Sequence, residues 1–67
     1  MVNVSINGNS QHIDADSTVQ DFLLSRSVDP THVVVELNGV ILERDLYAGT
    51  KLKSGDAVEI LRFVGGG

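Results

Sequence analysis

The sequence predicts an α+β domain in which a mixed five-stranded sheet is covered on one face by a single main helix. Three observations favour this arrangement. Asn-Gly pairs occur twice, at Asn7-Gly8 and Asn38-Gly39, and such a pair is the strongest short signal for a tight hairpin turn. A segment between the two hairpins has helical spacing, and a further strand-like segment follows the second hairpin. Since one helix cannot cover both faces of a sheet, it is expected to lie across one of them.

The first hairpin is predicted near the start of the chain. Apolar and polar side chains alternate along residues 2–6, which is typical of a strand with one face in solvent. Asn7-Gly8 is expected to reverse the chain, because a tight primed turn needs positive φ. A short return strand is expected at residues 10–13, and residues 14–17 end it.

A helix is predicted after this hairpin. Ser17-Thr18-Val19-Gln20 has the form of a capping box, so Ser17 is expected to cap the helix start. The following apolar residues recur at helical spacing, with Asp21 in the first turn and Arg26 in the last, where each charge suits the helix dipole. Asp29-Pro30 is expected to end the helix, because the residue before a proline is pushed out of the α region.

The second hairpin is predicted around Asn38-Gly39. Three β-branched valines at residues 33–35 favour a strand before it, and Glu36 marks the face of that strand in solvent. The side chains expected to point into the core are those of Val33, Val35 and Leu37. Val34 is expected to point outward, and the return strand is expected at residues 40–42.

The rest of the chain leads to the last strand. Residues 43–50 are expected to be irregular, with Tyr47 as an anchor against the core. Ser54-Gly55-Asp56 is a predicted turn, and residues 57–64 are the predicted last strand. The element order is therefore strand, strand, helix, strand, strand, strand. The first and last strands are expected to be parallel neighbours at the centre of the sheet, which is the β-grasp arrangement.

Length and composition limit the kind of protein. The 67 residues are expected to form one domain near the lower limit of independent folding, without any cysteine for disulfides or thiolate metal ligands. The formal net charge of −4 argues against nucleic-acid binding, which needs clustered lysine and arginine. No apolar run approaches the ~20 residues that span a bilayer, and no leader-like segment opens the chain. We expect a cytoplasmic protein with a β-grasp domain at residues 1–64 and a flexible glycine tail at residues 65–67.

The sequence does not indicate a catalytic or metal site. His12 and His32 lie on different predicted elements, and no cysteine or convergent set of acids accompanies them. A nucleophilic triad needs serine, histidine and acid side chains that converge in a pocket, and so short a chain leaves little room for one. We therefore expect no bound metal and no enzymatic activity.

The sequence finishes in Phe63-Val64-Gly65-Gly66-Gly67. Glycine offers no side chain to bury, so this end is either an unstructured tether or the carrier of a working terminal carboxylate. Three extended residues reach ~10 Å beyond a fold. Without Cβ atoms they can also pass through a channel too narrow for other residues. We favour delivery of the Gly67 carboxylate, with Gly65 and Gly66 threading the tail into a partner.

A partner-binding surface is predicted beside this tail. Val58 and Ile60 share the core face of the last strand, whereas Glu59 marks the opposite face as exposed. That exposed face nevertheless continues with Leu61 and Phe63, and exposed apolar residues beside a tail are typical of a docking site. The residues expected to contact a partner are Leu61, Phe63, Val64 and Val34. The alternative is that Leu61 and Phe63 cover an edge of the core or the irregular loop.

Residues along the whole chain together resemble one known family. The residues that carry the resemblance are Asn38-Gly39, Arg44, Tyr47, Leu52, Gly55-Asp56, Glu59-Ile60 and the terminal Gly66-Gly67. In these features the chain resembles the ThiS family, the ubiquitin-like β-grasp sulfur carriers of thiamin biosynthesis. The resemblance covers the whole chain in length and element order, and it is sharpest from residue 33 to residue 67.

This resemblance implies a role for the tail. A ThiF-like adenylyltransferase, using ATP and Mg²⁺, would convert the Gly67 carboxylate into an acyl adenylate. A sulfur donor of the cysteine desulfurase type would supply the sulfur of a thiocarboxylate, and a ThiG-like thiazole synthase would accept that sulfur. The protein would be a co-substrate of its activating partner, with no permanently bound cofactor.

Two other functions fit the same sequence. A MoaD-like carrier for molybdopterin, or a ubiquitin-like protein modifier, would use a similar tail, although MoaD relatives tend to be longer. A passive β-grasp binding module would carry the tail without using it. Removal of Gly66 and Gly67 separates these classes, because a carrier would lose its activity and keep its fold, whereas a passive module would keep its binding.

Overall fold

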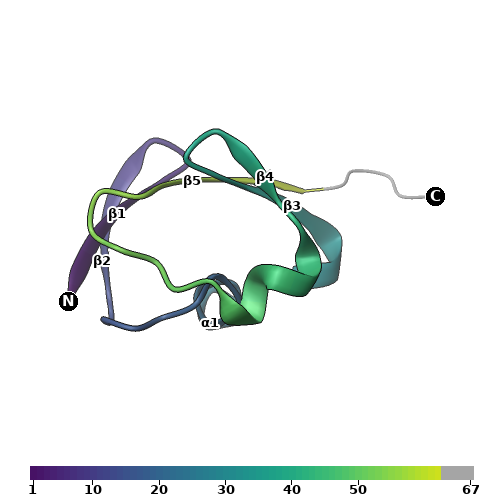
Figure 1. The fold of residues 1–67 in the computed structure, drawn as a ribbon, viewed down its shortest axis with the longest axis horizontal. Helices are drawn as coiled ribbons and strands as arrows, with labels where there is room; N and C mark the ends of the chain where they lie inside the picture. The colour runs from purple at the N-terminus through teal and green to yellow at the C-terminus, as the bar shows by residue number, and fades with distance from the viewer. Residues whose placement is uncertain (63–67) are drawn as a thin grey trace.

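The computed structural model of the protein describes residues 1–62, which form one sheet, one α-helix and two short 3-10 helices (Figure 1). In chain order the elements are β1 (Val2–Ile6), β2 (Asn9–Ile13), α1 (Val19–Ser25), η1 (Pro30–His32), β3 (Val33–Leu37), β4 (Val40–Leu42), η2 (Arg44–Gly49) and β5 (Ala57–Arg62). The predicted order of strands and helix is therefore confirmed.

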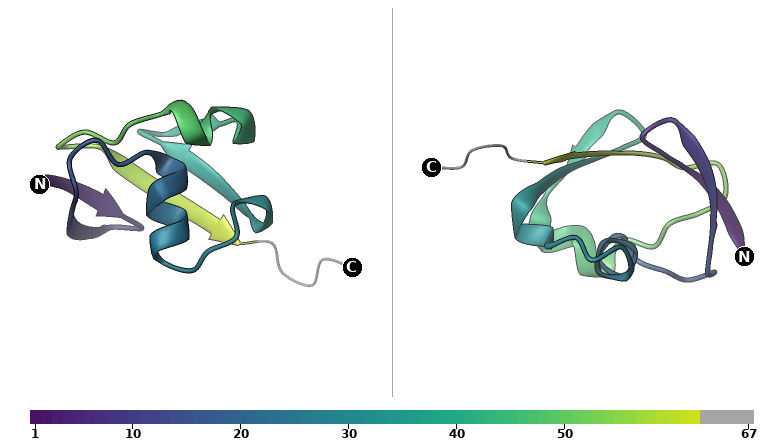
Figure 2. Two further views of the ribbon diagram at one scale, coloured as in Figure 1. Left: turned by 90° about the horizontal axis from the view of Figure 1, so that it is seen from below. Right: turned by 180° about the vertical axis from the view of Figure 1, so that it is seen from behind.

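The strands form a mixed sheet in the order β2-β1-β5-β3-β4. β1 and β5 are parallel neighbours, and the other neighbouring pairs are antiparallel. Helix α1 crosses one face of the sheet over β5, and η2 lies in the same layer (Figure 2). The predicted β-grasp arrangement, with the first and last strands parallel at its centre, is confirmed.

The core fills the space between the sheet and the helical layer. Leu23 of α1 and Val35 of β3 are both 0% exposed. The other buried apolar residues are Val4, Ile6, Ile13, Val19, Phe22, Val33, Tyr47, Leu52 and Val58. Leu37 and Ile60 are partly buried and pack against this cluster. The inward faces predicted for β3 and β5 are therefore confirmed, and each fully buried valine or leucine contributes about 1.5–3 kcal/mol of transfer free energy.

Helix α1 starts one residue later than predicted. Thr18 is the N-cap, because its Oγ1 accepts a hydrogen bond from Asp21 N–H and the Asp21 carboxylate accepts one from Thr18 N–H, both at 3.0 Å. Ser17 instead stays outside the helix, where its carbonyl accepts a hydrogen bond from Leu52 N–H at 2.9 Å. Pairing with the segment around Leu52 thus selects the second of two overlapping capping frames.

The helix ends at Ser25, earlier than the predicted boundary at Asp29-Pro30. Ser27 has a left-handed φ of 58°, and the N–H groups of Ser27 and Val28 donate to carbonyls of the last turn at 3.0 and 2.9 Å. This is a Schellman motif with serine at the position that usually holds glycine. Arg26 is consequently the C-cap residue, outside the last turn in which it was predicted to lie.

Three smaller features complete the comparison with the sequence. Strand β2 starts at Asn9, one residue before its predicted start. The segment predicted to be irregular contains η2, where Tyr47 is 2% exposed and its hydroxyl donates to the Val33 carbonyl at 3.5 Å, so its anchoring role is confirmed. Residues 63 and 64 of the predicted last strand lie outside the described range, and the boundary between domain and glycine tail stays a prediction.

Both Asn-Gly pairs form the predicted turns. Asn7 and Gly8 have φ values of 50° and 84°, and Asn38 and Gly39 have 52° and 84°. Positive φ at both central residues is the signature of a type I′ turn, whose twist matches that of the flanking strands.

Candidate functional site

The first hairpin turn holds the C-terminal half of β5. Asn7 Oδ1 accepts a hydrogen bond from Ile60 N–H at 2.7 Å, and Asn7 Nδ2 donates to the Ile60 carbonyl at 3.3 Å. Asn7 N–H also donates to the Val58 carbonyl at 2.8 Å. The Asn7 side chain therefore continues the hydrogen bonding between β1 and β5 beyond the last residue of β1. It holds β5 in place as far as Ile60.

The second hairpin turn holds the start of β5. Asn38 Oδ1 accepts a hydrogen bond from Ala57 N–H at 2.9 Å, and Asn38 Nδ2 donates to Asp56 Oδ1 at 3.0 Å. The other carboxylate oxygen of Asp56 accepts a hydrogen bond from Lys53 N–H at 2.8 Å. The two turns therefore clamp the central strand from both sides, and the C-terminal end of β5 points away from the side of the molecule where the N-terminus lies (Figure 1).

Side chains of β5 alternate between the core and solvent. Val58 is 2% exposed and Ile60 packs against the core, whereas Glu59 is exposed and Leu61 is 55% exposed. Leu61 therefore lies on the outer face of the sheet, opposite α1 and η2, and it covers neither the core nor the loop that contains Tyr47. This position agrees with the sequence, and the partner-binding role of Leu61 stays a prediction.

Two other apolar side chains lie near Leu61 on the outer face. Val34 is directly opposite Leu61 in the pairing of β3 with β5 and is partly buried. Ile41 of β4 is 64% exposed, pairs with outward-facing Glu36, and lines a hollow of about 320 Å³ together with Val34. We call Leu61, Val34 and Ile41 the exit patch, because they lie beside the end from which the chain leaves the sheet. Sequence reasoning missed Ile41, since the short apolar run at 40–42 shows no alternation that would reveal its face.

Two carboxylates lie beside the exit patch on the same face. Glu36 of β3 and Glu59 of β5 are directly opposite each other, and like charges in that arrangement destabilise a sheet. The ion pairs found within residues 1–62 involve other acids. We call Glu36 and Glu59 the acid pair, and its repulsion has no counterion in the described part of the chain.

The other side of the same strand end is basic. Arg62 is opposite buried Val33 in the pairing of β3 with β5, which places it on the helix-facing side. Arg62 and Arg26 line one hollow of about 370 Å³, which we call the arginine hollow. Arg26 donates a hydrogen bond of 2.6 Å to Gln11, and its guanidinium carbon lies 5.0 Å from the centroid of the Phe22 ring. That ring also lines the hollow, so the Arg26 guanidinium lies beside apolar surface within it.

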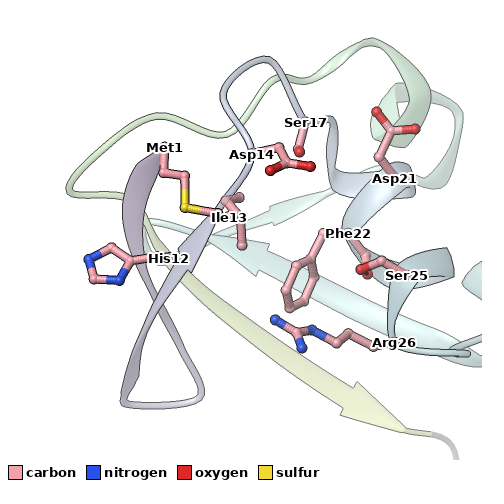
Figure 3. Close-up of a pocket in the computed structure, with 9 residues that line it drawn as sticks. All are labelled: Met1, His12, Ile13, Asp14, Ser17, Asp21, Phe22, Ser25 and Arg26. Atoms are coloured by element: carbon pink, nitrogen blue, oxygen red, sulfur yellow. Dashed lines mark hydrogen bonds between the residues drawn. The ribbon is translucent and has the colours of Figure 1, made fainter.

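A further hollow, between β2 and α1, contains side chains that could suggest catalysis (Figure 3). Its volume is about 430 Å³, and His12, Asp14, Ser17 and Asp21 are among the residues that line it. The His12 ring points away from the acids (Figure 3), and the Asp21 carboxylate already accepts a hydrogen bond from Thr18 N–H. A nucleophile, a base and an orienting acid therefore do not converge in this hollow.

The other histidine belongs to a structural cap. His32 Nδ1 lies 3.7 Å from Asp29 Oδ2, and Asp29 caps η1 by accepting hydrogen bonds from the Thr31 N–H and hydroxyl at 2.9 and 2.7 Å. The hydrogen bond from the Thr31 N–H, followed by that from its hydroxyl, lowers the pKa of Asp29, and His32 and Arg44 lower it further. Across residues 1–62, no group of three or more histidine, cysteine or acidic side chains could hold a metal ion.

The structure brings together part of the site predicted from the sequence. Leu61 and Val34 lie side by side, whereas Phe63, Val64 and the glycines at 65–67 lie outside the described residues. Ile41, the acid pair and the arginine hollow are additions, because their positions depend on strand pairings that the sequence does not reveal.

The fold and the end of β5 together define the class of protein, a ubiquitin-like β-grasp domain whose last strand leads into a glycine run. A ubiquitin-like β-grasp domain presents an exposed apolar patch at the end of its central strand, and the sequence continues from that strand into a glycine run. Within the described range, no helix has the length and apolar character needed to cross a membrane.

The chain belongs to the ThiS family, because the model of that family matches residues 4–67. It is similar to the crystal structure of the thiamine biosynthesis protein ThiS from Geobacter metallireducens. The two are 42% identical with a TM-score of 0.83, and the match covers 98% of this chain and 100% of that one. The sulfur carrier protein ThiS of Bacillus subtilis is 40% identical over 50 residues, which are 75% of this chain and 76% of that protein. The resemblance stated from the sequence is therefore confirmed, and the chain is a homologue of a sulfur carrier protein.

The chain is also similar to part of larger proteins. A thiazole synthase of Paramagnetospirillum magneticum is 39% identical over 62 residues, which are 92% of this chain and 19% of that protein. The chain spans about a fifth of the length of the curated thiazole synthases that it matches. Its likeness to them is thus a likeness to one region of each.

Proposed function

We propose that this chain is a sulfur carrier whose Gly67 carboxylate is adenylated and converted to a thiocarboxylate, which donates sulfur for thiazole formation in thiamin biosynthesis. The observation that carries the proposal is the match to the ThiS family, which runs through residue 67. The exit patch supports it, since exposed apolar surface lies at the end of the strand that leads to the glycines.

The chemistry follows from the poor reactivity of a carboxylate. A carboxylate has no adequate leaving group, so it must be activated before a sulfur nucleophile can replace one of its oxygens. One Gly67 oxygen attacks the α-phosphorus of ATP and releases pyrophosphate, which leaves an acyl adenylate. The terminal sulfur of a donor persulfide then displaces AMP and forms an acyl disulfide. A thiol attacks the donor's sulfur in that disulfide, which breaks the S–S bond, releases the thiocarboxylate and leaves a disulfide between the donor and the thiol. The chain itself supplies only the carboxylate, and catalysis belongs to the partner.

The exit patch provides binding energy for holding the tail. Ordering three glycines costs about 3–6 kcal/mol of conformational entropy. At about 25 cal/mol per Å², burial of roughly 120–240 Å² of apolar surface offsets that cost. Leu61 and Ile41 are large and more than half exposed, so a partner that covers the exit patch can bury area of this order.

The partners of the proposed reaction follow from the resemblance to the ThiS family. A ThiF-like adenylyltransferase would supply ATP and Mg²⁺, and a donor of the cysteine desulfurase type would supply sulfur. A ThiG-like thiazole synthase would be the acceptor, and the thiazole synthases that contain a similar region support this choice. The chain would hold no permanent cofactor. The cytoplasmic location expected from the sequence belongs to the same proposal.

The alternatives differ in what they do with the tail. A MoaD-like carrier or a protein modifier would use the same activation, and similarity to the named ThiS proteins favours the thiamin pathway over both. A passive binding module would not be activated at all.

The experiment that tests the proposal removes Gly66 and Gly67. With an activating enzyme present, the full chain is expected to support ATP–pyrophosphate exchange, and the truncated chain is expected to support none while keeping its circular dichroism spectrum. Equal exchange by both chains, or none by the full chain, would refute the carrier function. Recovery of sulfur in molybdopterin instead of thiazole would favour the MoaD-like alternative.

A further inference from the structure

Opposite charges flank the end of β5. The acid pair, Glu36 and Glu59, lies beside the exit patch on the outer face, and Arg62 lies on the helix-facing side. Successive side chains of a strand point to opposite faces, so Glu59 and Arg62 cannot meet the same group of a partner. A partner that surrounds this strand end therefore meets negative charge on one side and positive charge on the other.

The outer side fits a cation. Glu36 and Glu59 repel each other across the strands, and neither forms an ion pair within residues 1–62. A lysine or arginine of a partner, placed over the two carboxylates, would relieve this repulsion. Because the exit patch adjoins the acid pair, the cation would stand beside an apolar contact.

The inner side fits an anion. Arg62 is exposed and lines the arginine hollow together with Arg26, whose guanidinium lies over the Phe22 ring. The chain has five lysine and arginine residues and a net charge of −4, so two arginines that line one hollow are unusual for its overall charge. An aspartate or glutamate side chain of a partner would pair with them through charge-assisted hydrogen bonds.

We propose that the acid pair and the arginine hollow form an orientation key for the ATP-dependent activating enzyme. The enzyme presents a basic side chain to the acid pair and an acidic side chain to the arginine hollow, which fixes how the domain is rotated about β5. This inference rests on the proposed function, because it concerns the docking of the same tail.

The chemistry of activation explains why the activating enzyme is expected to carry charges that complement the acid pair and the arginine hollow. An enzyme that holds a nucleoside triphosphate places cationic side chains around the phosphates. The Gly67 carboxylate is repelled by those phosphates, so its approach needs attraction elsewhere in the complex. The acid pair supplies that attraction toward basic side chains of the enzyme. The arginine hollow disfavours the reversed orientation, because like charges would meet in it.

A pair of charge reversals on one strand tests the key. The variants are Glu59→Lys, Arg62→Glu and the double variant, measured in the full chain as kcat/KM for ATP–pyrophosphate exchange. The two reversals cancel, so the double variant keeps the net charge of the wild type. Asp14→Lys is the control, because it makes the same charge change as Glu59→Lys at an exposed site beyond β2.

The orientation key predicts a distinct pattern of rates. Each single reversal is expected to lower kcat/KM by about ten-fold, because each turns an attraction across the interface into repulsion. The double variant should be slower than either single variant, and Asp14→Lys should match the wild type within about two-fold. Glu59→Lys should at the same time raise the melting temperature, since it places an opposite charge against Glu36.

Four outcomes would overturn the inference. A double variant as fast as the wild type would mean that only net charge matters, and a loss confined to one side would remove the orientation function. Both results leave the proposed function standing. Self-association of the wild-type chain through this surface, seen by sedimentation and abolished by Glu59→Lys, would assign it to a second copy instead. If the wild-type chain is not activated at all, the proposed function fails, and the orientation key fails with it.

Discussion

The two faces of β5 carry similar apolar residues but differ in what covers them. On the inner face, Val58 belongs to the core and Ile60 packs against it. On the outer face, Leu61 is more than half exposed and lies next to an uncompensated pair of acids. A single strand thus holds the domain together with one set of side chains and leaves the other set free for contact.

This difference separates stability from binding along one short segment. Substitutions on the inner face remove buried area from a core that supplies only ~3–5 kcal/mol of net stability in so small a domain. Substitutions on the outer face change what a partner meets and leave the core intact. The following predictions use this separation, from the largest expected effect to the smallest.

The inner face should respond most strongly to truncation. Val58→Ala is expected to lower the free energy of unfolding by about 2–3 kcal/mol, because it leaves a cavity at a site that is 2% exposed. Urea unfolding monitored by circular dichroism measures this change. A loss below the error of the measurement would show that the β5 core is not packed as described.

Truncation on the outer face should weaken binding to a partner and leave stability almost unchanged. Leu61→Ala is expected to change the unfolding free energy by no more than about 0.5 kcal/mol. It should weaken binding to the activating enzyme by about 1–3 kcal/mol, the range of an interface anchor. Titration calorimetry gives the affinity, and Val40→Ala serves as a matched control, since Val40 is 68% exposed on the β4 edge outside the exit patch. Equal losses of affinity in the two variants would argue against a local docking site.

The path of β5 should depend on one asparagine. Asn7→Gly keeps a residue that adopts positive φ easily but removes two hydrogen bonds to Ile60, so we expect a loss of about 1–2 kcal/mol. Hydrogen exchange at the Ile60 amide should become faster. Asn7→Asp retains the 2.7 Å acceptor and should protect this amide better than glycine does. Unchanged exchange in the glycine variant would refute the clamp.

A small dependence of stability on acid pH is expected from Asp29, which caps η1. Because the pKa of Asp29 is lowered in the folded state, its charged form stabilises the fold above its ordinary pKa of 3.8, and this contribution is lost as the pH falls through the lower folded-state value. Asp29→Asn should therefore flatten the decline in melting temperature at acid pH. Asp14→Asn provides the control for loss of one exposed acid, and an equal effect of both variants would contradict the role of the Thr31 hydrogen bonds.

Local patterns in the sequence predict the fold well, except where distant segments decide between local options. Alternation and the two Asn-Gly turns suffice for the strands and for the two hairpin pairings, β1 with β2 and β3 with β4. The overlapping frames at Ser17 and Thr18 are equally plausible locally, and the pairing with Leu52 chooses between them. The helix end is hidden because Ser27 takes the left-handed position that glycine would have marked.

Less of the candidate site than of the fold can be predicted from the sequence. The outward position of Leu61 follows from alternation along β5. The acid pair, in contrast, depends on the register that sets Glu36 against Glu59, and the arginine hollow depends on the packing of α1 beside β5. The second role of Asn7, as a clamp on Ile60, is a contact across 53 positions that no local pattern encodes.

The most direct measurement is the intact mass of the chain after incubation with ATP, an activating enzyme and a sulfur source, followed by fragmentation. A gain equal to the replacement of one oxygen by one sulfur, located at Gly67 and dependent on ATP, is the result expected of a sulfur carrier. An unchanged mass under conditions in which a known carrier is converted, or a modification at any other residue, would contradict that function.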